Sequence, residues 1–414
     1  MKIMLNTPKG LRLHIGLFGR RNVGKSTVLN ALTEQQVSIV SDVAGTTTDP
    51  VEKPLELLPL GPVVFIDTAG IDDTGELGAM RIEKTKKIFD RTDLALVICE
   101  GNRFDQFEQE IVGRLAELNV PYIIVINKID VCAPSAEHIA SLEKTHKRVV
   151  TCNAKDSIGI LELKQAIIKA VPDDWINPPT LVADLCGAGE LAVLVVPIDL
   201  EAPKGRLILP QVQVIREILD NDGMSLVVKE RELVDVFEVS KRKPAIVITD
   251  SQAVLKVCAD VPCDVKVTTF SILFARYKGD LHSFVEGVFA IDSLRDGDKV
   301  LIGEACSHHS IADDIGTVKI PRWLRQYTGK NIVFEKHAGH DYPDDLSGYK
   351  LIIHCGSCMF NRREMLNRIL LAESQGVPIT NYGIAISYLQ GVLQRTTEPF
   401  AGVHYMVTQR LRKY

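Results

Sequence analysis

The sequence lacks two features that would assign a chain to a membrane or to nucleic acid, namely long apolar runs and a strong excess of positive charge. No apolar run approaches the roughly 20 residues that span a bilayer. The N-terminal stretch MKIMLNTPKGLRLHIGLFG has no long apolar core and no small-residue cleavage pattern, so we expect no signal peptide. The net charge of -5 provides no general attraction to nucleic acid or to an anionic membrane. We therefore expect a cytoplasmic protein that binds neither.

The sequence also lacks the even cysteine count of a disulfide framework. It contains nine cysteines, an odd number, in a long chain of expected cytoplasmic location. This count favours a mixture of buried, free and metal-binding thiols. Six of the nine have no metal-ligand spacing and are interpreted as structural: Cys99, Cys132, Cys152, Cys186, Cys258 and Cys263.

The composition and the order of the predicted elements indicate an α/β protein. Hydrophobic residues make up 46% and charged residues 24% of the 414 residues, which is typical of a folded chain of two or three domains. Over the first ~175 residues, apolar strand-like runs alternate with segments of helical spacing. This alternation predicts a mostly parallel sheet with helices on both faces.

Two boundaries are predicted along the chain. The segment AVPDDWINPPT, residues 170–180, ends the first alternating pattern with clustered prolines and is interpreted as a linker. A second, smaller α/β unit follows to about residue 265, and a third α/β unit comes after it. No proline- or glycine-rich linker marks the second boundary. We therefore expect domains at 1–173, 174–265 and 266–414.

The stretch GRRNVGKS, from Gly19 to Ser26, matches the phosphate-loop pattern GxxxxGK[ST] between a predicted strand and a predicted helix. Backbone N–H groups of such a loop converge on phosphate oxygens at a helix N-terminus. Lys25 is expected to bridge the β- and γ-phosphates, and the Ser26 hydroxyl to hold Mg²⁺. The alternative is a glycine-containing turn that binds nothing. The other expected nucleotide contacts of this loop are Asn22, Val23, Gly24 and Thr27.

Two later motifs predict the nucleotide. DTAG, from Asp67 to Gly70, ends a predicted strand, and its aspartate is expected to reach Mg²⁺ through water. NKID, with Asn127, Lys128 and Asp130, ends another strand. The Asp130 carboxylate can accept two hydrogen bonds from guanine N1 and N2, which adenine cannot supply, so we expect GTP or GDP and not ATP.

The order and spacing of these motifs resemble the Ras-like superfamily of small GTPases. The stretch NAK resembles the base-contacting SAK loop of that superfamily, with asparagine in the serine position, so we expect base contacts from Asn153, Ala154 and Lys155. Ile71 follows DTAG where Ras has its water-positioning glutamine, which predicts slow hydrolysis. Carboxylates at Asp72, Asp73 and Glu76 are available, but we assign no catalytic residue.

The stretch AGTTTD, residues 44–49, resembles the switch I pattern GTTxD of bacterial tRNA-modification and ribosome-assembly GTPases. The resemblance implies that Thr47, or alternatively Thr46, coordinates Mg²⁺ when the γ-phosphate is present. Asn22 also matches those relatives, in which such an asparagine helps to bind K⁺ near the phosphates. A purely structural role for Asn22, as a turn residue that tolerates left-handed backbone, is equally compatible with the sequence.

Two cysteine–histidine groups near the C-terminus each follow a predicted strand. Cys306 and His308 follow DKVLIGEA, and His354, Cys355 and Cys358 follow LSGYKLII. If the two strands are neighbours, three thiolates meet at the carboxyl edge of one sheet, where ligands collect in open α/β folds. Three cysteines suit a [4Fe–4S] cluster with one exchangeable iron, and a Cys₃His zinc site is also chemically sound. From these residues alone, a site that binds neither stays open. A helix predicted after Cys358 would direct its N-terminal dipole at the cluster.

A GTPase of this type followed by C-x-H and H-C-x-x-C resembles the HydF family of [FeFe]-hydrogenase maturation GTPases. The resemblance implies a middle dimerisation domain, a homodimer and a C-terminal domain with a [4Fe–4S] cluster on Cys306, Cys355 and Cys358. His308 and His354 would be iron ligands or residues beside the ligands. It further implies a carrier that receives a transient diiron precursor built by radical-SAM maturases and delivers it to the apo-[FeFe]-hydrogenase. GTP hydrolysis would regulate partner association.

Two other functions remain open at this level. A tRNA-modification or ribosome-assembly GTPase should carry a basic RNA-binding module, and no Lys/Arg-rich or aromatic run stands out after residue 175. A redox sensor, in which the state of an iron–sulfur cluster gates GTP hydrolysis, is compatible with the same motifs.

Overall fold

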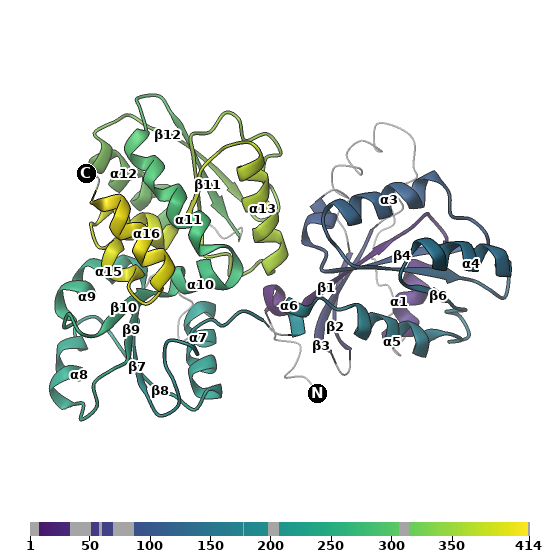
Figure 1. The fold of residues 1–414 in the computed structure, drawn as a ribbon, viewed down its shortest axis with the longest axis horizontal. Coiled ribbons are helices and arrows are strands. Elements are labelled where there is room, and N and C mark those ends of the chain that lie inside the picture. Colours follow the sequence, from purple (N-terminus) through teal and green to yellow (C-terminus); the bar gives the residue numbers. More distant parts are fainter. Residues whose placement is uncertain are drawn as a thin grey trace. The chain divides into compact units, whose positions relative to one another are not determined.

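The computed structural model describes residues 8–33, 51–57, 60–68, 87–176, 178–197, 207–305 and 314–412. The chain forms two compact units, the N-terminal unit Met1–Pro178 and the C-terminal unit Pro179–Tyr414. The division lies at the end of the predicted linker. Figure 1 shows the first unit in purple and blue and the second in teal to yellow.

The N-terminal unit contains a six-stranded sheet of order β2-β3-β1-β4-β5-β6. All neighbouring strands are parallel except the antiparallel pair β2 and β3. The strands are β1 Leu13–Phe18, β2 Val51–Leu57, β3 Gly61–Asp67, β4 Leu94–Glu100, β5 Tyr122–Asn127 and β6 Val149–Thr151. The described helices are η2 Lys9–Leu11, α1 Lys25–Thr33, α3 Gln106–Glu117, α4 Ala136–Thr145, α5 Ile160–Ala170 and α6 Asp173–Ile176.

Helices cover both faces of this sheet, so its strands are apolar on both sides. In β5, Ile123 and Val125 pack into the cluster that contains α1 and α5, whereas Ile124 and Ile126 pack against α4. Helix α3 packs on the same face as α4, against alternate residues of β4. Successive side chains of a strand point to opposite faces, which explains why these strands read as continuous hydrophobic runs. The α/β prediction for this unit is confirmed.

The C-terminal unit contains two parallel four-stranded sheets of orders β10-β9-β7-β8 and β12-β11-β13-β14. The strands of the first sheet are β7 Leu191–Val195, β8 Met224–Val228, β9 Ile246–Thr249 and β10 Lys266–Thr269. Those of the second are β11 Lys299–Glu304, β12 Val333–Ala338, β13 Leu351–His354 and β14 Ile379–Asn381.

The helices of this unit connect and cover the two sheets (Figure 1). The α-helices are α7 Leu209–Asp220, α8 Leu233–Val239, α9 Val254–Asp260, α10 Phe270–Lys278, α11 Leu281–Val288, α12 Ile320–Thr328, α13 Arg362–Ser374, α14 Tyr382–Leu389, α15 Leu393–Thr397 and α16 Ala401–Leu411. Short turns of other helix types are η3 Ser251–Ala253, η4 Phe289–Ser293 and η5 Ile315–Lys319. Within the described ranges, no helix combines the length and the hydrophobicity of a membrane span.

One hydrophobic core joins the two sheets of the C-terminal unit. Helix α10 lies in this core and buries Phe270, Ile272, Leu273 and Phe274. A helix that is apolar around most of its circumference is buried on all sides. The predicted boundary at residue 265 falls directly before β10, which pairs in parallel with β9. Strand β10 therefore belongs with the preceding sheet, and the division into three domains stays a prediction.

Candidate functional site

The phosphate loop connects β1 to α1 and needs glycine at two positions. Gly19 has φ +147°, and a Cβ atom there would lie 2.3 Å from the carbonyl oxygen of Ile98. Gly24 has φ +92°, and a Cβ atom would lie 2.4 Å from the Asn127 side chain. Asn22 adopts the left-handed φ of 65°, which asparagine tolerates better than most residues. The loop backbone thus has the tight shape that the GxxxxGK pattern predicts.

Lys25 and Ser26, the first residues of α1, lie at the mouth of this loop. Lys25 is buried, and its Nζ donates hydrogen bonds to the carbonyls of Gly19 at 2.7 Å and Arg20 at 2.9 Å. The Ser26 hydroxyl lies 3.2 Å from Oδ2 of Asp67, at the end of the neighbouring strand β3. The pairing of β1 with β3 brings the two predicted magnesium-binding residues together.

Asp67 fits a role in metal binding. Its Oδ1 is buried and accepts no hydrogen bond from the described part of the chain. Burial raises the pKa of this carboxyl, while the Lys25 charge and the Ser26 hydroxyl lower it. A hydroxyl and a buried carboxylate oxygen form the kind of donor set that Mg²⁺ prefers, usually with bound water.

Asn127, the last residue of β5, joins the phosphate loop to the predicted base-binding loop. Its Nδ2 donates to the Val23 carbonyl at 3.0 Å, and its Oδ1 accepts from the Ala154 N–H at 3.1 Å. Asn153 shapes the second loop, because its Oδ1 accepts from the Lys155 N–H at 3.1 Å. The phosphate loop, the NKID loop and the loop that contains Asn153 therefore meet at the carboxyl edge of the sheet.

The other predicted nucleotide-binding residues lie nearer the surface or outside the described residues. Lys128 has φ 58°, and its Nζ donates to Glu100 at 2.9 Å. Asp130 and Thr27 are exposed. Thr46, Thr47 and Gly70 lie outside the described residues, so their roles in binding nucleotide and Mg²⁺ stay predictions.

An ion pair that the sequence motifs do not predict links the phosphate loop to α3. Arg20 Nε donates to Oε1 of the buried Glu108 at 2.8 Å, and its guanidinium lies 4.8 Å from the centre of the Phe107 ring. The only sequence signal is that Glu108 occupies the N3 position of α3 behind Asp105, where it also completes a capping box. The residues are 88 positions apart, so local pattern reasoning does not connect them.

The C-terminal cysteine site forms at the carboxyl edge of the second sheet. Strands β11 and β13 are parallel neighbours, with Gly303 opposite His354, which was the condition for bringing the two cysteine groups together. The Cys355 N–H donates to the Gly303 carbonyl at 2.9 Å, and the Ala305 N–H donates to Sγ of Cys355 at 3.1 Å. The backbone that leads into Cys306 is thus bonded directly to the Cys355 sulfur.

Cys355 and Cys358 are half-buried cysteines on the turn between β13 and α13. Burial raises the pKa of Cys358, and the charge of the buried Lys278 opposes that rise. The helix predicted after Cys358 is confirmed as α13, whose first turn is capped by the Asn361 side chain. Cys306 and His308 lie outside the described residues. Within the described ranges, no three potential metal ligands cluster.

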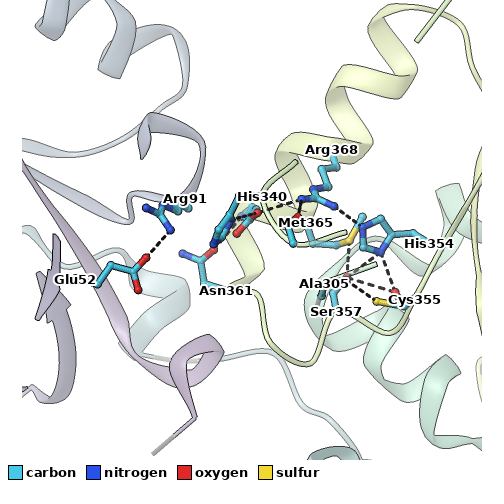
Figure 2. Close-up of polar contacts among 12 residues, drawn as sticks. Glu52, Arg91, Ala305, His340, His354, Cys355, Ser357, Asn361, Met365 and Arg368 are labelled. Carbon is cyan, nitrogen blue, oxygen red and sulfur yellow. Dashed lines mark hydrogen bonds and ion pairs between the residues drawn. The ribbon is translucent and has the colours of Figure 1, made fainter. Parts of the chain in front are cut away.

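His354 is fully buried, and its ring nitrogens have partners (Figure 2). Nη1 of Arg368 lies 2.8 Å from Nε2, and the Cys355 carbonyl lies 3.0 Å from Nδ1. Burial, and secondarily the Arg368 charge, lowers the pKa of His354 to about 3, so the ring is neutral at pH 7. Arg368 carries no sequence signal of function, because it lies inside a helix of ordinary polarity.

Three family models match the chain. The model described as "Hydrogen maturase F dimerization domain" matches residues 181–279, and the "Hydrogen maturase F tetramerization domain" matches residues 282–399. Together these two cover more than half of the chain. The model described as "50S ribosome-binding GTPase" matches residues 14–128, which include the phosphate loop, DTAG and the first two residues of NKID.

Curated relatives and solved structures resemble part of the chain. GTPase Der of Wolinella succinogenes is 32% identical over 180 residues, which are 41% of this chain and 38% of the relative. The tRNA modification GTPase MnmE of Desulfotalea psychrophila is 37% identical over 158 residues, 37% of this chain and 33% of the relative. The chain thus spans 38% and 33% of the length of these two relatives.

Among solved structures, Aquifex aeolicus Era bound to GDP.AlF4- is 32% identical, with 38% of this chain and 56% of that chain covered and a TM-score of 0.34. This score is too low to support an argument about the whole fold. The assignment rests instead on the family models, which agree with the motif order. The N-terminal unit is a P-loop GTPase domain, and the chain belongs to the HydF family of hydrogenase maturation GTPases.

Proposed function

We propose that the chain is a GTP-binding iron–sulfur scaffold that matures [FeFe]-hydrogenase. The observation that carries this proposal is the hydrogen bond from the Ala305 N–H to Sγ of Cys355 across the paired strands β11 and β13. Because residue 306 follows Ala305 directly, this bond holds the residue before Cys306 beside the C-x-x-C turn. The bond therefore supports a common location for the three proposed thiolates.

Cys306, Cys355 and Cys358 are proposed to hold a [4Fe–4S] cluster, which offers an exchangeable iron when bound. The surrounding residues suit anionic sulfur. The Ala305 N–H donates to Cys355, and Lys278 contributes positive charge near Cys358. The cargo is a diiron precursor, made with radical-SAM maturases and delivered to the apo-hydrogenase. Anaerobic reconstitution, followed by iron and sulfide analysis and hydrogenase activation with the same sample, tests this role.

The GTPase domain is proposed to bind GTP with Mg²⁺ and to hydrolyse it slowly. Lys25 would neutralise phosphate charge, while Ser26, Asp67 and a switch I threonine would hold the metal. Asp130 would select guanine. The absence of glutamine at Ile71 supports slow turnover, and the nucleotide state would regulate association with partner proteins.

We expect GTP hydrolysis to be several-fold faster in K⁺ than in Na⁺. The motif match of Asn22 supports an oxygen contact to K⁺, and the residue is exposed in the loop. Rates measured in the two salts at matched ionic strength check this expectation. Asn22→Gly is the matched variant, because glycine keeps the positive φ and removes only the amide; it should hydrolyse GTP equally in both salts. Equal rates in the unmodified protein would exclude K⁺ activation.

Strand β8 is proposed as the dimer interface. The sheets of the C-terminal unit have four edge strands. Strand β10 is packed against α15, and β14 against α11. Strand β12 carries Glu335, Lys336 and His337, and charges of this kind deter strand pairing. Strand β8 carries three exposed apolar side chains, Met224, Leu226 and Val227, which are 37%, 37% and 42% exposed, whereas the charged edge strand β12 carries one, Val333.

A proline at Val227 should convert the dimer to a monomer. The Met224 N–H donates to the Glu190 carbonyl directly before β7, and the Val228 carbonyl accepts from the Val196 N–H directly after it. The alternate residues Ser225 and Val227 therefore direct their backbone groups to the open edge. Val227→Pro therefore removes one outward N–H and leaves the ladder with β7 intact. Sedimentation should show a dimer or larger assembly for the unmodified chain and for Val227→Thr, which keeps the N–H. A Val227→Pro protein of unchanged mass would refute this interface.

A further inference from the structure

Arg368, on α13, is buried between two aromatic rings beside the cysteine turn. Its guanidinium carbon lies 4.4 Å from the centre of the Tyr342 ring and 4.3 Å from that of Phe360. Nη2 donates to the Gly339 carbonyl at 2.7 Å, and Nη1 lies 2.8 Å from Nε2 of His354 (Figure 2). The guanidinium is thus held in one orientation, with one N–H aimed at the histidine.

This contact determines which nitrogen of His354 carries the proton. A guanidinium can only donate hydrogen bonds, so Nε2 of His354 is the acceptor and is unprotonated. In the neutral ring the proton therefore lies on Nδ1, 3.0 Å from the Cys355 carbonyl and 3.2 Å from Oγ of Ser357. Both ring nitrogens of His354 therefore have hydrogen-bond partners, one on α13 and the other on the cysteine turn.

The ring also has little freedom to reorient toward a metal. A Cβ atom added to Gly303 on the neighbouring strand would lie 2.7 Å from Cδ2 of His354, so the ring packs directly on β11. The centres of the Tyr342 and Phe360 rings lie 6.4 and 6.2 Å from the centre of the His354 ring. Rotation of the imidazole would leave the buried Nη1 of Arg368 without its acceptor, which is costly in a dry environment.

We propose that Arg368 is a positioning residue of the cysteine site, acting through His354 to hold the carbonyl of Cys355, and that His354 is not an iron ligand. The proposal rests on the proposed [4Fe–4S] function. Arg368 donates a hydrogen bond to Nε2 of His354, and Nδ1 of the same ring anchors the turn from Cys355 to Ser357. The turn needs such an anchor because Ser357 has the left-handed φ of 54°, an unfavourable conformation for serine.

Iron loss and electron paramagnetic resonance of the anaerobically reconstituted full chain test this proposal. Arg368→Met keeps the bulk of the side chain and removes its donors. We expect this variant to lose iron to a chelator about 10- to 100-fold faster than the unmodified chain, in line with the 10- to 100-fold loss of metal affinity that follows removal of the groups that orient metal ligands. Arg368→Lys keeps one donor and should show a smaller increase, and it provides the measurement if the methionine variant fails to fold.

Arg276→Met is the matched control. Arg276 also lies over an aromatic ring, 5.0 Å from the centre of Phe400, and donates to the Leu181 carbonyl at 2.7 Å. The substitution removes a comparable arginine of the same unit and leaves the contacts of His354 unchanged. We expect this variant to lose iron at the unmodified rate.

Pulsed measurements on the reduced cluster test the second half of the proposal. The unmodified chain and His354→Gln should show the same nitrogen couplings, because the substitution removes no directly bound histidine. A strong coupling that disappears in His354→Gln would overturn the proposal, as would equal iron loss from Arg368→Met and the unmodified chain. If the unmodified chain assembled no cluster, the proposed function itself would fail, and this inference with it.

Discussion

Replacing Cys355 with alanine is expected to abolish assembly of the [4Fe–4S] cluster. The cube needs three thiolate anchors, and this variant leaves only two. The change also removes the sulfur that accepts the Ala305 N–H, which links β11 to the cysteine turn. Iron and sulfide content after anaerobic reconstitution should fall to background, the cluster resonance should be absent, and the same sample should fail to activate apo-hydrogenase.

Cys263→Ala provides the control, because Cys263 is an exposed free thiol of the same unit. It should reconstitute like the unmodified chain. A Cys355→Ala protein with a full complement of iron and sulfide would show that the three-thiolate site is wrong. Stoichiometric zinc in unmodified protein purified anaerobically from iron-replete cells would favour a zinc site instead.

Asp130→Asn is expected to weaken GTP binding on the order of 100-fold or more and to improve binding of xanthosine triphosphate. The carboxylate accepts two guanine N–H bonds, and hydrogen bonds to a charged group contribute about 1.5–3 kcal/mol each. Asparagine cannot accept both, but it can donate to the C2 carbonyl of xanthine. Because Asp130 is exposed, the substitution should leave the fold intact. Titration calorimetry with GTP and with xanthosine triphosphate measures this change of preference.

Lys25→Ala distinguishes base recognition from phosphate recognition. It removes the ammonium of the phosphate loop, so the affinities for both nucleotides should fall together, without the exchange of preference that Asp130→Asn produces. Undiminished GTP affinity in Asp130→Asn would refute the assignment of NKID as the guanine-binding motif.

The nucleotide half of the site could be predicted from sequence because its motifs are local. Eight consecutive residues specify the phosphate loop, and the glycines at 19 and 24 have positive φ values that belong to the shape of the loop itself. Asp67 and Asn127 each end an apolar run, and parallel strands place their carboxyl ends at one edge. The motif order therefore predicted the P-loop fold and the position of its ligand site.

The cysteine half depended on contacts that no local pattern contains. The sequence by itself determined that Cys306, Cys355 and Cys358 follow two strands, and the H-C-x-x-C pattern and the family resemblance suggested a metal. Only the tertiary structure decided that β11 and β13 are neighbours and that β10 pairs with β9 across the predicted boundary. Only it brought Arg368 to Nε2 of His354. Strand order and side-chain partners across a core depend on the packing of the whole unit, whereas a turn or a strand end depends on its own residues.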